Sequence, residues 1–441
     1  MPTTYRPYRP DQSFLLPPSP KDWLSEDHLV YFISETVDRM DLSGFYGRYE
    51  GDGRRNRPFD PRMMVKVLLY GYATGIFSSR KLAKKLEEDV AFRVLGGGNF
   101  PAHRTICEFR QRHLKEFQEL FVQLVRIARE AGMIRLGTVA VDGAKVKANA
   151  SKRKAMSYQR MKQEDERLRR EIEQLTEQAR RVDEEEDRIY GEDRRGDELP
   201  EELRRREDRL AKIEAAMERL KQRQAEEDRR RGRQEGDDRK SPRGGRKFKR
   251  EFGEPDAKAQ DNFTDPDSRI MMSKGSFQQC YNSQIAVDEG SQLIVATGIT
   301  QSAGDNPQLP KLVECTQTNT KGRPKRLLAD AGYRDETNFR DLEEQGIDAY
   351  IALGREDKKA VQEPTPELPA SWRMQEKLKT EAGRAQYKRR KAIVEPVFGW
   401  VKQVLGFRRF SVRGIDHVVG EWDLVCLAVN LKRMNSLIRW V

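Results

Sequence analysis

Two short apolar runs, each followed directly by an aspartate, constrain the fold of this chain more than any other feature. Residues 138–141 precede Asp142 in the segment VAVDGAKVKANAS, and residues 326–329 precede Asp330 in RLLADAGYRD. Apolar runs of this length are typical of buried strands. A third acid, Glu395, lies in RRKAIVEPVFGWVK, whose apolar spacing is helical. The pattern predicts a sheet with carboxylates at the carboxyl ends of its strands.

The order of the expected elements indicates the class of fold. A long insertion follows the first strand, and two strands at 280–288 and 293–300 are then joined by a turn at 289–291. A helix ending near Thr316 leads to the strand that ends at Asp330. This order predicts an α/β core, a mixed sheet flanked by helices, with the layout of an RNase H-like domain. In that layout the two strands that end in aspartates are neighbours, so their carboxylates meet.

Asp305 and Pro396 are interpreted from local helix chemistry. Asp305-Asn306 precedes an apolar helical run, as an amino-terminal cap does, so we interpret Asp305 as a cap and not as a metal ligand. Pro396 lacks a backbone N–H, so the helix that carries Glu395 either begins near Pro396 or bends there. Glu395 and Lys402 are seven residues apart, which places them on one face of a helix.

Three carboxylates at one sheet edge are suited to phosphodiester chemistry. Carboxylate oxygens are hard ligands for Mg²⁺, and two such ions can activate an attacking water or 3′-hydroxyl while stabilising the leaving oxygen. We expect Asp142 and Asp330 to share one ion and Glu395 to hold the second, with Mn²⁺ as an alternative metal. Each acid alone is more often a turn, cap or surface residue. The prediction depends on all three occurring in this order.

The net charge indicates the class of partner. The 441 residues include 84 Lys and Arg against 72 Asp and Glu, which gives a formal net charge of +12. A basic chain gains affinity for nucleic acid because it neutralises phosphates and releases their counterions. Double-stranded DNA is therefore the expected partner.

The cysteines and the apolar content exclude several other classes of protein. The four cysteines form no Cys-x-x-Cys pair, so we expect reduced thiols in a cytoplasmic protein, and the four histidines show no zinc-binding spacing with them. No stretch is apolar and long enough to span a membrane. Residues 1–20 are rich in proline, lack the apolar block of a signal peptide, and are expected to form an extended arm. The cysteines are Cys107, Cys280, Cys315 and Cys426.

Residues 21–135 are predicted to form an all-helical DNA-binding domain. Two short helices, a glycine-rich break at 96–98 and a basic helix from Pro101 resemble a helix-turn-helix. A helical bundle with a solvated basic face explains the same pattern, and both interpretations stay open. The side chains expected to face DNA are Arg104, Arg110, Arg112 and Lys115.

Residues 151–228 are predicted to form a coiled-coil insertion. Apolar residues at alternating steps of four and three, such as Leu168, Ile172 and Leu175, are typical of a coiled-coil seam. Breaker residues at 190–200 indicate a turn, so we expect two long antiparallel helices.

Residues 229–263 are predicted to form a basic, disordered linker. Between residues 229 and 250 there are eleven Lys or Arg and three Asp or Glu, with one large apolar residue, Phe248. Such a segment cannot bury enough apolar surface to offset its ordering entropy. A tether on the DNA backbone and a solvated linker are equal alternatives.

At these residues the chain resembles a known family, the DDE transposases of bacterial insertion sequences, in the superfamily of the insertion-sequence-four and insertion-sequence-five types. The resemblance covers nearly the whole chain. It is carried by Asp142 in V-D-G, Asp330 in A-D-A-G-Y and Glu395 in V-E-P-V-F-G. It implies that residues 136–150 and 264–441 form the RNase H-like catalytic domain.

The family also implies residues that contact DNA near the third acid. Its members often carry a Tyr, Arg, Glu and Lys signature, which Tyr387, Glu395 and Lys402 fit. The arginine departs from the pattern, because the family has three residues between it and the glutamate, whereas four separate Arg390 from Glu395. The matching position holds Lys391. The resemblance thus implies a phosphate contact from Arg390 or Lys391, beside contacts from Tyr387 and Lys402.

The activity that the resemblance implies is DNA transposition. Such an enzyme binds the terminal inverted repeats of its element, pairs two ends as a homodimer, and catalyses Mg²⁺-dependent cleavage and strand transfer. The expected location is the bacterial cytoplasm, in association with the nucleoid. Two alternatives are an RNase H-like nuclease without transposition and a DNA-binding protein whose site is catalytically dead.

Overall fold

The computed structural model describes residues 19–49, 57–190, 201–236, 250–273, 275–354 and 368–439. The chain divides into two compact units, one that joins Met1–Val146 to Asn282–Val441 and one that comprises Lys147–Tyr281. Nearly all of the predicted extended arm lies outside the described residues.

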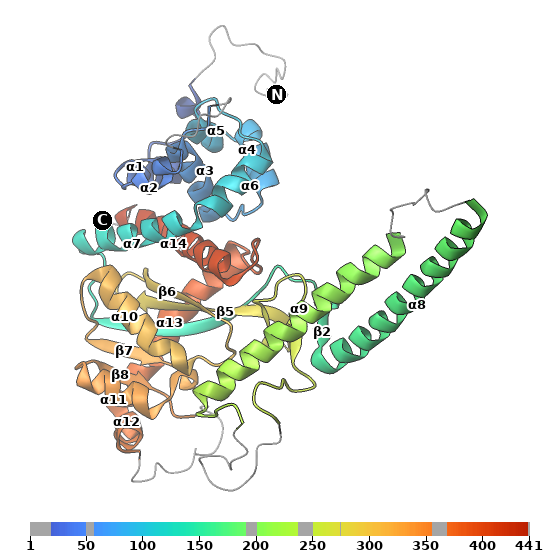
Figure 1. Cartoon of the computed structure of the whole chain (residues 1–441). Helices are drawn as coiled ribbons and strands as arrows, with labels where there is room; N and C mark the ends of the chain where they lie inside the picture. The colour runs from blue at the N-terminus through green and yellow to red at the C-terminus, as the bar shows by residue number, and fades with distance from the viewer. Residues whose placement is uncertain are drawn as a thin grey trace, which may run out of the picture. The chain divides into compact units, whose positions relative to one another are not determined.

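A mixed sheet, most of whose residues fall in the first unit, organises the fold (Figure 1). The strand order is β4-β5-β1-β7-β8, and β6 pairs with β5 as well. β1, β7 and β8 are parallel, whereas β5 is antiparallel to β4 and β6. This is the mixed sheet that the order of elements predicted, and it is compatible with an RNase H-like domain. The strands are β1 Thr138–Lys147, β4 Arg269–Ser273, β5 Ser276–Asp288, β6 Ile294–Thr300, β7 Arg326–Ala329 and β8 Asp348–Ile351.

Helices flank this sheet and bury its central strands. Every residue of β5 from Gln279 to Asp288 is buried, as expected for a strand covered on both faces. The helix α10 packs against β6, α13 packs against β7 and β8, and α14 packs against β6. Two short 3-10 helices, η3 and η4, connect strands and helices of this region. The elements are η3 Asn306–Gln308, α10 Leu309–Thr320, η4 Ala331–Tyr333, α11 Glu336–Glu344, α12 Pro369–Lys379, α13 Glu381–Gly399, a π-helix (η5) Trp400–Val404 and α14 Ile415–Arg439.

The amino-terminal region is helical, as predicted. Local signals explain its boundaries: Asp60 accepts hydrogen bonds from the backbone N–H groups of Arg62 and Met63, and Pro61 occupies the first turn of α3. The helix α5 ends at Gly97, whose φ of 53° is a left-handed conformation. The elements are η1 Pro20–Trp23, α1 Leu29–Asp38, α2 Ser43–Gly47, α3 Pro61–Ala73, α4 Ser79–Glu88, α5 Val90–Gly96, α6 His103–Arg112 and α7 Leu114–Glu130.

The amino-terminal helices share a core with the end of the chain. Both α3 and α7 pack against α14, and α7 also packs against α10. Trp422 of α14 is fully buried, and its indole N–H donates to the carbonyl of Gln284 on β5 at 3.1 Å. The predicted helical domain at 21–135 therefore belongs to the same compact unit as the sheet. None of the described helices is both long and apolar enough to cross a membrane.

The helix that carries Glu395 continues through Pro396. Because Pro396 has no N–H, the carbonyl of Ala392 loses its usual helical partner, and the side chain of Gln292 donates to it at 3.2 Å instead. Since α13 begins at Glu381, the alternative in which the helix begins near Pro396 is excluded. A π-helical turn follows directly, in which the N–H of Leu405 donates to the carbonyl of Trp400.

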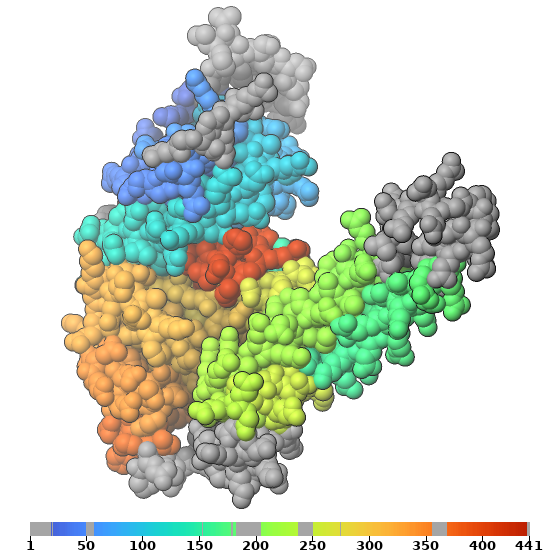
Figure 2. Space-filling view, in the orientation of Figure 1, coloured from blue at the N-terminus to red at the C-terminus, as the bar shows by residue number. Residues whose placement is uncertain are grey.

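The second unit contains a helical hairpin, which we define as α8 Tyr158–Tyr190 and α9 Glu201–Arg230. Ion pairs such as Arg206–Glu171 at 3.0 Å and Arg209–Glu164 at 2.6 Å join the helices and fit an antiparallel arrangement. Figure 2 shows the two helices side by side. The turn predicted at 190–200 lies almost entirely outside the described residues. The buried residues between the helices are Tyr158, Met161, Leu168, Ile213, Ala216 and Leu220.

The segment that follows the hairpin is more ordered than predicted. Residues 237–249 lie outside the described residues, but 250–263 include β3 Gln260–Asn262, which pairs with β2 Ala155–Ser157. Asp261 of β3 is buried and forms ion pairs with two arginines of α9. The prediction of a disordered linker is therefore wrong for 250–263, because a buried carboxylate paired with arginine side chains holds this part of the chain in place.

Candidate active site

Asp142 and Asp330 lie next to each other where the pairing of two parallel strands ends. Asp330 directly follows β7, whereas β1 continues past Asp142 to Lys147, so the predicted strand end at Asp142 is wrong and Asp142 lies within the strand. Ala140 of β1 pairs with Leu328 of β7, and each aspartate follows its paired residue by two positions. One oxygen of Asp142 accepts from the N–H of Gly143 at 2.8 Å. One oxygen of Asp330 accepts from the N–H of Gly332 at 2.8 Å, which caps η4. The predicted meeting of these two acids is thus present in the structure.

The electrostatics of Asp142 reflect this crowding. Burial raises the pKa of Asp142 to about 6, and the neighbouring charges of Asp330 and Asp305 add to the increase. Arg390 acts in the opposite direction, since its Nη1 lies 3.3 Å from Asp142 Oδ2. The Arg390 side chain is itself buried, and its Nε has no hydrogen-bond partner within the described part of the chain. Arg390 therefore compensates part of the charge that the two aspartates concentrate.

Asp305 does not act as the helix cap that the sequence indicated. Its side chain makes no capping hydrogen bond to η3. Instead, Asp305 Oδ1 accepts from Lys145 Nζ at 3.2 Å, Asn282 Nδ2 at 2.5 Å and Gln284 Nε2 at 2.8 Å. The capping prediction is wrong because three donors from β1 and β5 compete for the same oxygen. The sequence signal for this arrangement is the pair of amides Asn282 and Gln284, two residues apart and therefore on one face of a buried strand.

No contact among the described residues links the third predicted acid, Glu395, to the other two, so its place in the site stays a prediction. Glu395 is exposed on α13. Within the described ranges, no group of three or more His, Cys, Asp or Glu side chains is arranged to hold a metal ion. The structure brings Asp142 and Asp330 together, and the pair is suited to a divalent cation because the charge of Asp330 adds to the cost of ionising Asp142.

The other residues predicted around Glu395 occupy several environments. Arg390, and not the exposed Lys391, is the cation beside Asp142. The Tyr387 ring is half-buried, with the Arg390 guanidinium 6.0 Å from its centroid. Lys402 is half-buried on the π-helix, and its Nζ lies 5.5 Å from the centroid of the Phe398 ring.

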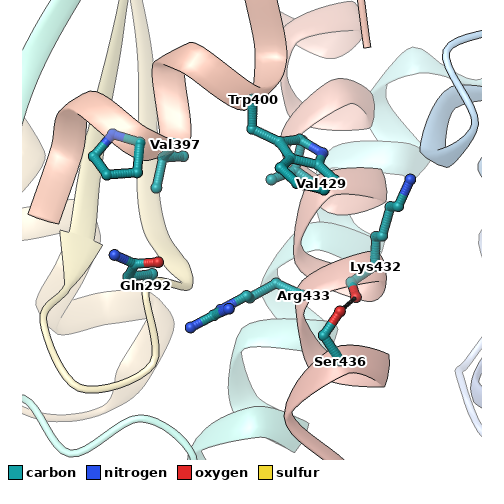
Figure 3. Close-up of a pocket in the computed structure, with 8 residues that line it drawn as sticks. Gln292, Val397, Trp400, Val429, Lys432, Arg433 and Ser436 are labelled. Carbon is teal, nitrogen blue, oxygen red and sulfur yellow. Dashed lines mark hydrogen bonds between the residues drawn. The ribbon is translucent and has the colours of Figure 1, made fainter. Parts of the chain in front are cut away.

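A pocket opens beside Pro396 of α13 and Trp400 of η5 (Figure 3). Lys432 Nζ lies 5.1 Å from the centroid of the Trp400 ring. Arg433 Nε donates to the carbonyl of Ser291 at 2.8 Å, so its guanidinium is anchored to the turn between β5 and β6. The lining residues are Gln292, Pro396, Val397, Trp400, Val429, Lys432, Arg433 and Ser436.

The predicted DNA-contacting residues of α6 and α7 separate into exposed and buried side chains. Arg104, Arg112 and Lys115 are exposed. Arg110 is only 4% exposed, and its Nη1 donates to the Tyr72 hydroxyl at 3.1 Å and to the carbonyl of Phe77 at 2.8 Å. Because these bonds enclose the guanidinium in the core, Arg110 is corrected from a DNA contact to a structural residue.

Two family models match the chain. One, described as a transposase DDE domain, matches residues 248–431, and the other, a transposase domain (DUF772), matches residues 18–112. The chain belongs to the insertion-sequence DDE transposases. No curated protein and no solved structure matches it.

The two matches include most of the elements described above. Asp330 and Glu395 of this transposase fall inside the DDE match, whereas Asp142 lies between the two matched regions. Transposases bind DNA, and those of the DDE kind use divalent metal ions. The assignment to the insertion-sequence-four or insertion-sequence-five type stays a prediction.

Proposed function

We propose that this transposase binds the terminal inverted repeats of an insertion sequence and catalyses Mg²⁺-dependent cleavage and strand transfer. The observation that supports this most strongly is that Asp142 of β1 and Asp330, directly after β7, lie side by side, with Arg390 beside Asp142. A site of this kind concentrates negative charge where a divalent cation and a DNA phosphate meet. The charge of the whole chain, +12, favours the same substrate.

In this proposal the chain contributes the ligands and the groups that position the DNA. A divalent cation, when bound, supplies the positive charge that activates a water or 3′-hydroxyl and stabilises the leaving oxygen. Asp142 and Asp330 hold it, with Glu395 as the third acid of the site. Arg390 keeps Asp142 ionised and faces the phosphate, and Tyr387 and Lys402 hold the DNA strand near the acids.

DNA recognition is assigned to the amino-terminal helices. The exposed Arg104, Arg112 and Lys115 lie on α6 and at the start of α7, which follow the short helices α4 and α5. Contacts of such side chains with phosphates fix the register of a protein on DNA. Two copies of the chain would pair the two ends of the element as a homodimer.

The test is a cleavage and strand-transfer assay on DNA that carries the element ends, with Asp142→Asn, Asp330→Asn and Glu395→Gln. These changes keep the shape of each side chain and remove its charge. Each should abolish cleavage and strand transfer and leave end binding near normal. Substantial cleavage by any one variant would remove that residue from the site. If the wild type nicks DNA without strand transfer, the nuclease alternative is favoured. If it binds DNA but neither nicks nor transfers strands, the alternative of a catalytically dead DNA-binding protein is favoured.

A further inference from the structure

A chain of hydrogen bonds links Asp305 to the segment that follows Asp330. Asp305 Oδ1 accepts from Gln284 Nε2 at 2.8 Å. At its other end, Gln284 Oε1 accepts from the hydroxyl of Tyr333. Gln284 and Tyr333 are both fully buried, so water does not compete for these bonds. We call Asp305, Gln284 and Tyr333 the positioning chain.

The orientation of the Gln284 amide is determined by its two neighbours. The ionised carboxylate of Asp305 can only accept, so it selects the NH₂ group of the amide. The hydroxyl of Tyr333 donates to the amide oxygen of Gln284, which faces away from Asp305. If the amide were turned over, its oxygen would face a carboxylate, so a single arrangement satisfies all three groups.

Tyr333 in turn fixes the backbone that carries Asp330. The N–H of Tyr333, the last residue of η4, donates at 3.2 Å to the carbonyl of Asp330, which caps that single turn. Asn338 Nδ2 donates to the carbonyl of Tyr333 at 3.0 Å and to that of Asn306, next to Asp305, at 2.9 Å. The turn after Asp330 and the turn that contains Asp305 are therefore tied together at two points.

Two glycines show how closely the positioning chain surrounds the aspartates. A Cβ added at Gly332 would lie 2.9 Å from Asp330 Oδ1 and 3.0 Å from Asp305 Oδ2. A Cβ added at Gly143, next to Asp142, would lie 2.2 Å from Gln284 Nε2 and 2.8 Å from Asp305 Oδ1. The space beside each aspartate is thus filled by a group of the positioning chain.

We propose that Asp305 and Gln284 are positioning residues that, through Tyr333, hold Asp330 at the place where it shares a cation with Asp142. The inference rests on the proposed function and assigns Asp305 a role that the family signature does not contain. Three donors occupy Asp305 Oδ1, and Lys145 balances the charge of the carboxylate. In this proposal Asp305 acts through its neighbours, and its Oδ1, occupied by three donors, is not available to the cation. Partners of this kind typically change metal affinity or activity by about 10- to 100-fold when they are removed.

Two measurements on the full-length protein test this role. The first is amide hydrogen exchange of residues 330–334 without metal, and the second is calorimetric titration with MgCl₂. Tyr333→Phe and Gln284→Met remove hydrogen bonds with little change in volume. Each should speed exchange in 330–334 and weaken Mg²⁺ binding by about tenfold or more. If Tyr333→Phe does not fold, Gln284→Met carries the same test.

The matched control is Tyr72→Phe, which removes another buried tyrosine hydroxyl, one that donates to Glu421 at 3.1 Å. This variant should leave both the exchange of 330–334 and the Mg²⁺ affinity unchanged. If Tyr72→Phe changed either quantity as much as Tyr333→Phe does, the effect of Tyr333→Phe would reflect a general loss of stability, and the proposal would be overturned.

The variants of Asp305 separate a positioning residue from a cation ligand. Asp305→Asn can still accept from Gln284 through its amide oxygen, so it should bind Mg²⁺ more tightly than Asp305→Ala. If both variants lost Mg²⁺ binding equally while Gln284→Met and Tyr333→Phe were neutral, Asp305 would be a ligand and the proposal would be wrong. If the wild-type protein binds no Mg²⁺, the proposed catalytic function fails. The exchange measurement needs no metal, so it still tests the positioning chain.

Discussion

Asp142 and Asp330 occupy equivalent positions on two adjacent parallel strands, each two residues beyond the paired Ala140 and Leu328. This relationship places two carboxylates together at a buried sheet edge, where burial and mutual repulsion raise the pKa of Asp142 to about 6. The arrangement is unfavourable for the protein alone and becomes favourable when a cation is bound. The first prediction follows from that difference.

Without metal, Asp142→Asn should stabilise the folded protein at neutral pH. The pKa of Asp142 rises from 3.8 to about 6 on folding. This group therefore costs almost nothing below about pH 3. The cost grows as the pH rises from about 4 to 6 and levels off above about pH 7 at roughly 3 kcal/mol. Urea unfolding in EDTA at pH 4 and pH 7.5 checks this. Asp142→Asn should gain stability only at the higher pH, and a loss of stability at pH 7.5 would contradict the account.

Arg390 and Lys391 should differ in their effect on the pH dependence of cleavage. Arg390 lies 3.3 Å from Asp142 and lowers its pKa, whereas Lys391 is exposed. Arg390→Met should therefore move the acidic limb of the pH profile for Mg²⁺-dependent nicking to higher pH. Lys391→Met serves as the control and should leave the profile in place. Equal shifts in both variants would mean that the family spacing, and not the observed contact, identifies the functional cation.

Substitutions of the exposed basic residues of α6 and α7 should weaken DNA binding, whereas substitution of the buried Arg110 should weaken the fold. Arg104→Ala, Arg112→Ala and Lys115→Ala should each weaken end binding and reduce its salt dependence by about one counterion. Arg110→Met should instead destabilise the fold by about 3 kcal/mol, because it leaves the buried Glu421 without a nearby cation. Filter binding at several salt concentrations and thermal unfolding separate the two effects. These measurements require the full chain, since α14 covers α3 and α7.

Lys402 should matter for catalysis more than for binding. It lies on the π-helical turn that follows the Glu395 helix, and its ammonium could hold a DNA phosphate near the acids. Lys402→Ala should reduce strand transfer at least tenfold and change end binding little. Lys388→Ala, an exposed lysine on the same helix, is the control and should change neither. Small and equal effects at both positions would mean that Lys402 has no catalytic role in this transposase and that the family signature extends no further than Glu395.

Local sequence patterns predict the buried strands and the long helices correctly. Apolar runs before Asp142 and Asp330 specified neighbouring buried strands, and the spacing at Leu168 and Ile213 specified two long packed helices. The charge of Arg110 favours a DNA contact, but its position in the helix does not. Ile106, Phe109 and Arg110 are all buried on α6, so the helical period puts this arginine on the apolar face.

Other features depend on contacts that no local pattern contains. Asp305 has the sequence context of a helix cap, yet its Oδ1 accepts hydrogen bonds from donors on two strands that are distant in sequence. The same is true of Asp261, whose arginine partners come from a helix about forty residues earlier. Tertiary hydrogen bonds override a local propensity of about 1 kcal/mol when they bury the same carboxylate.

The most direct test of the account is divalent cation binding by wild type, Asp142→Asn and Asp330→Asn. Calorimetric titration of the full-length protein with MgCl₂, and with MnCl₂ as a second probe, measures it without DNA. The account predicts one or more ions bound by the wild type and an affinity at least tenfold lower in each variant, with the fold intact by circular dichroism. Binding that is unchanged in both variants would contradict the claim that Asp142 and Asp330 form the metal site.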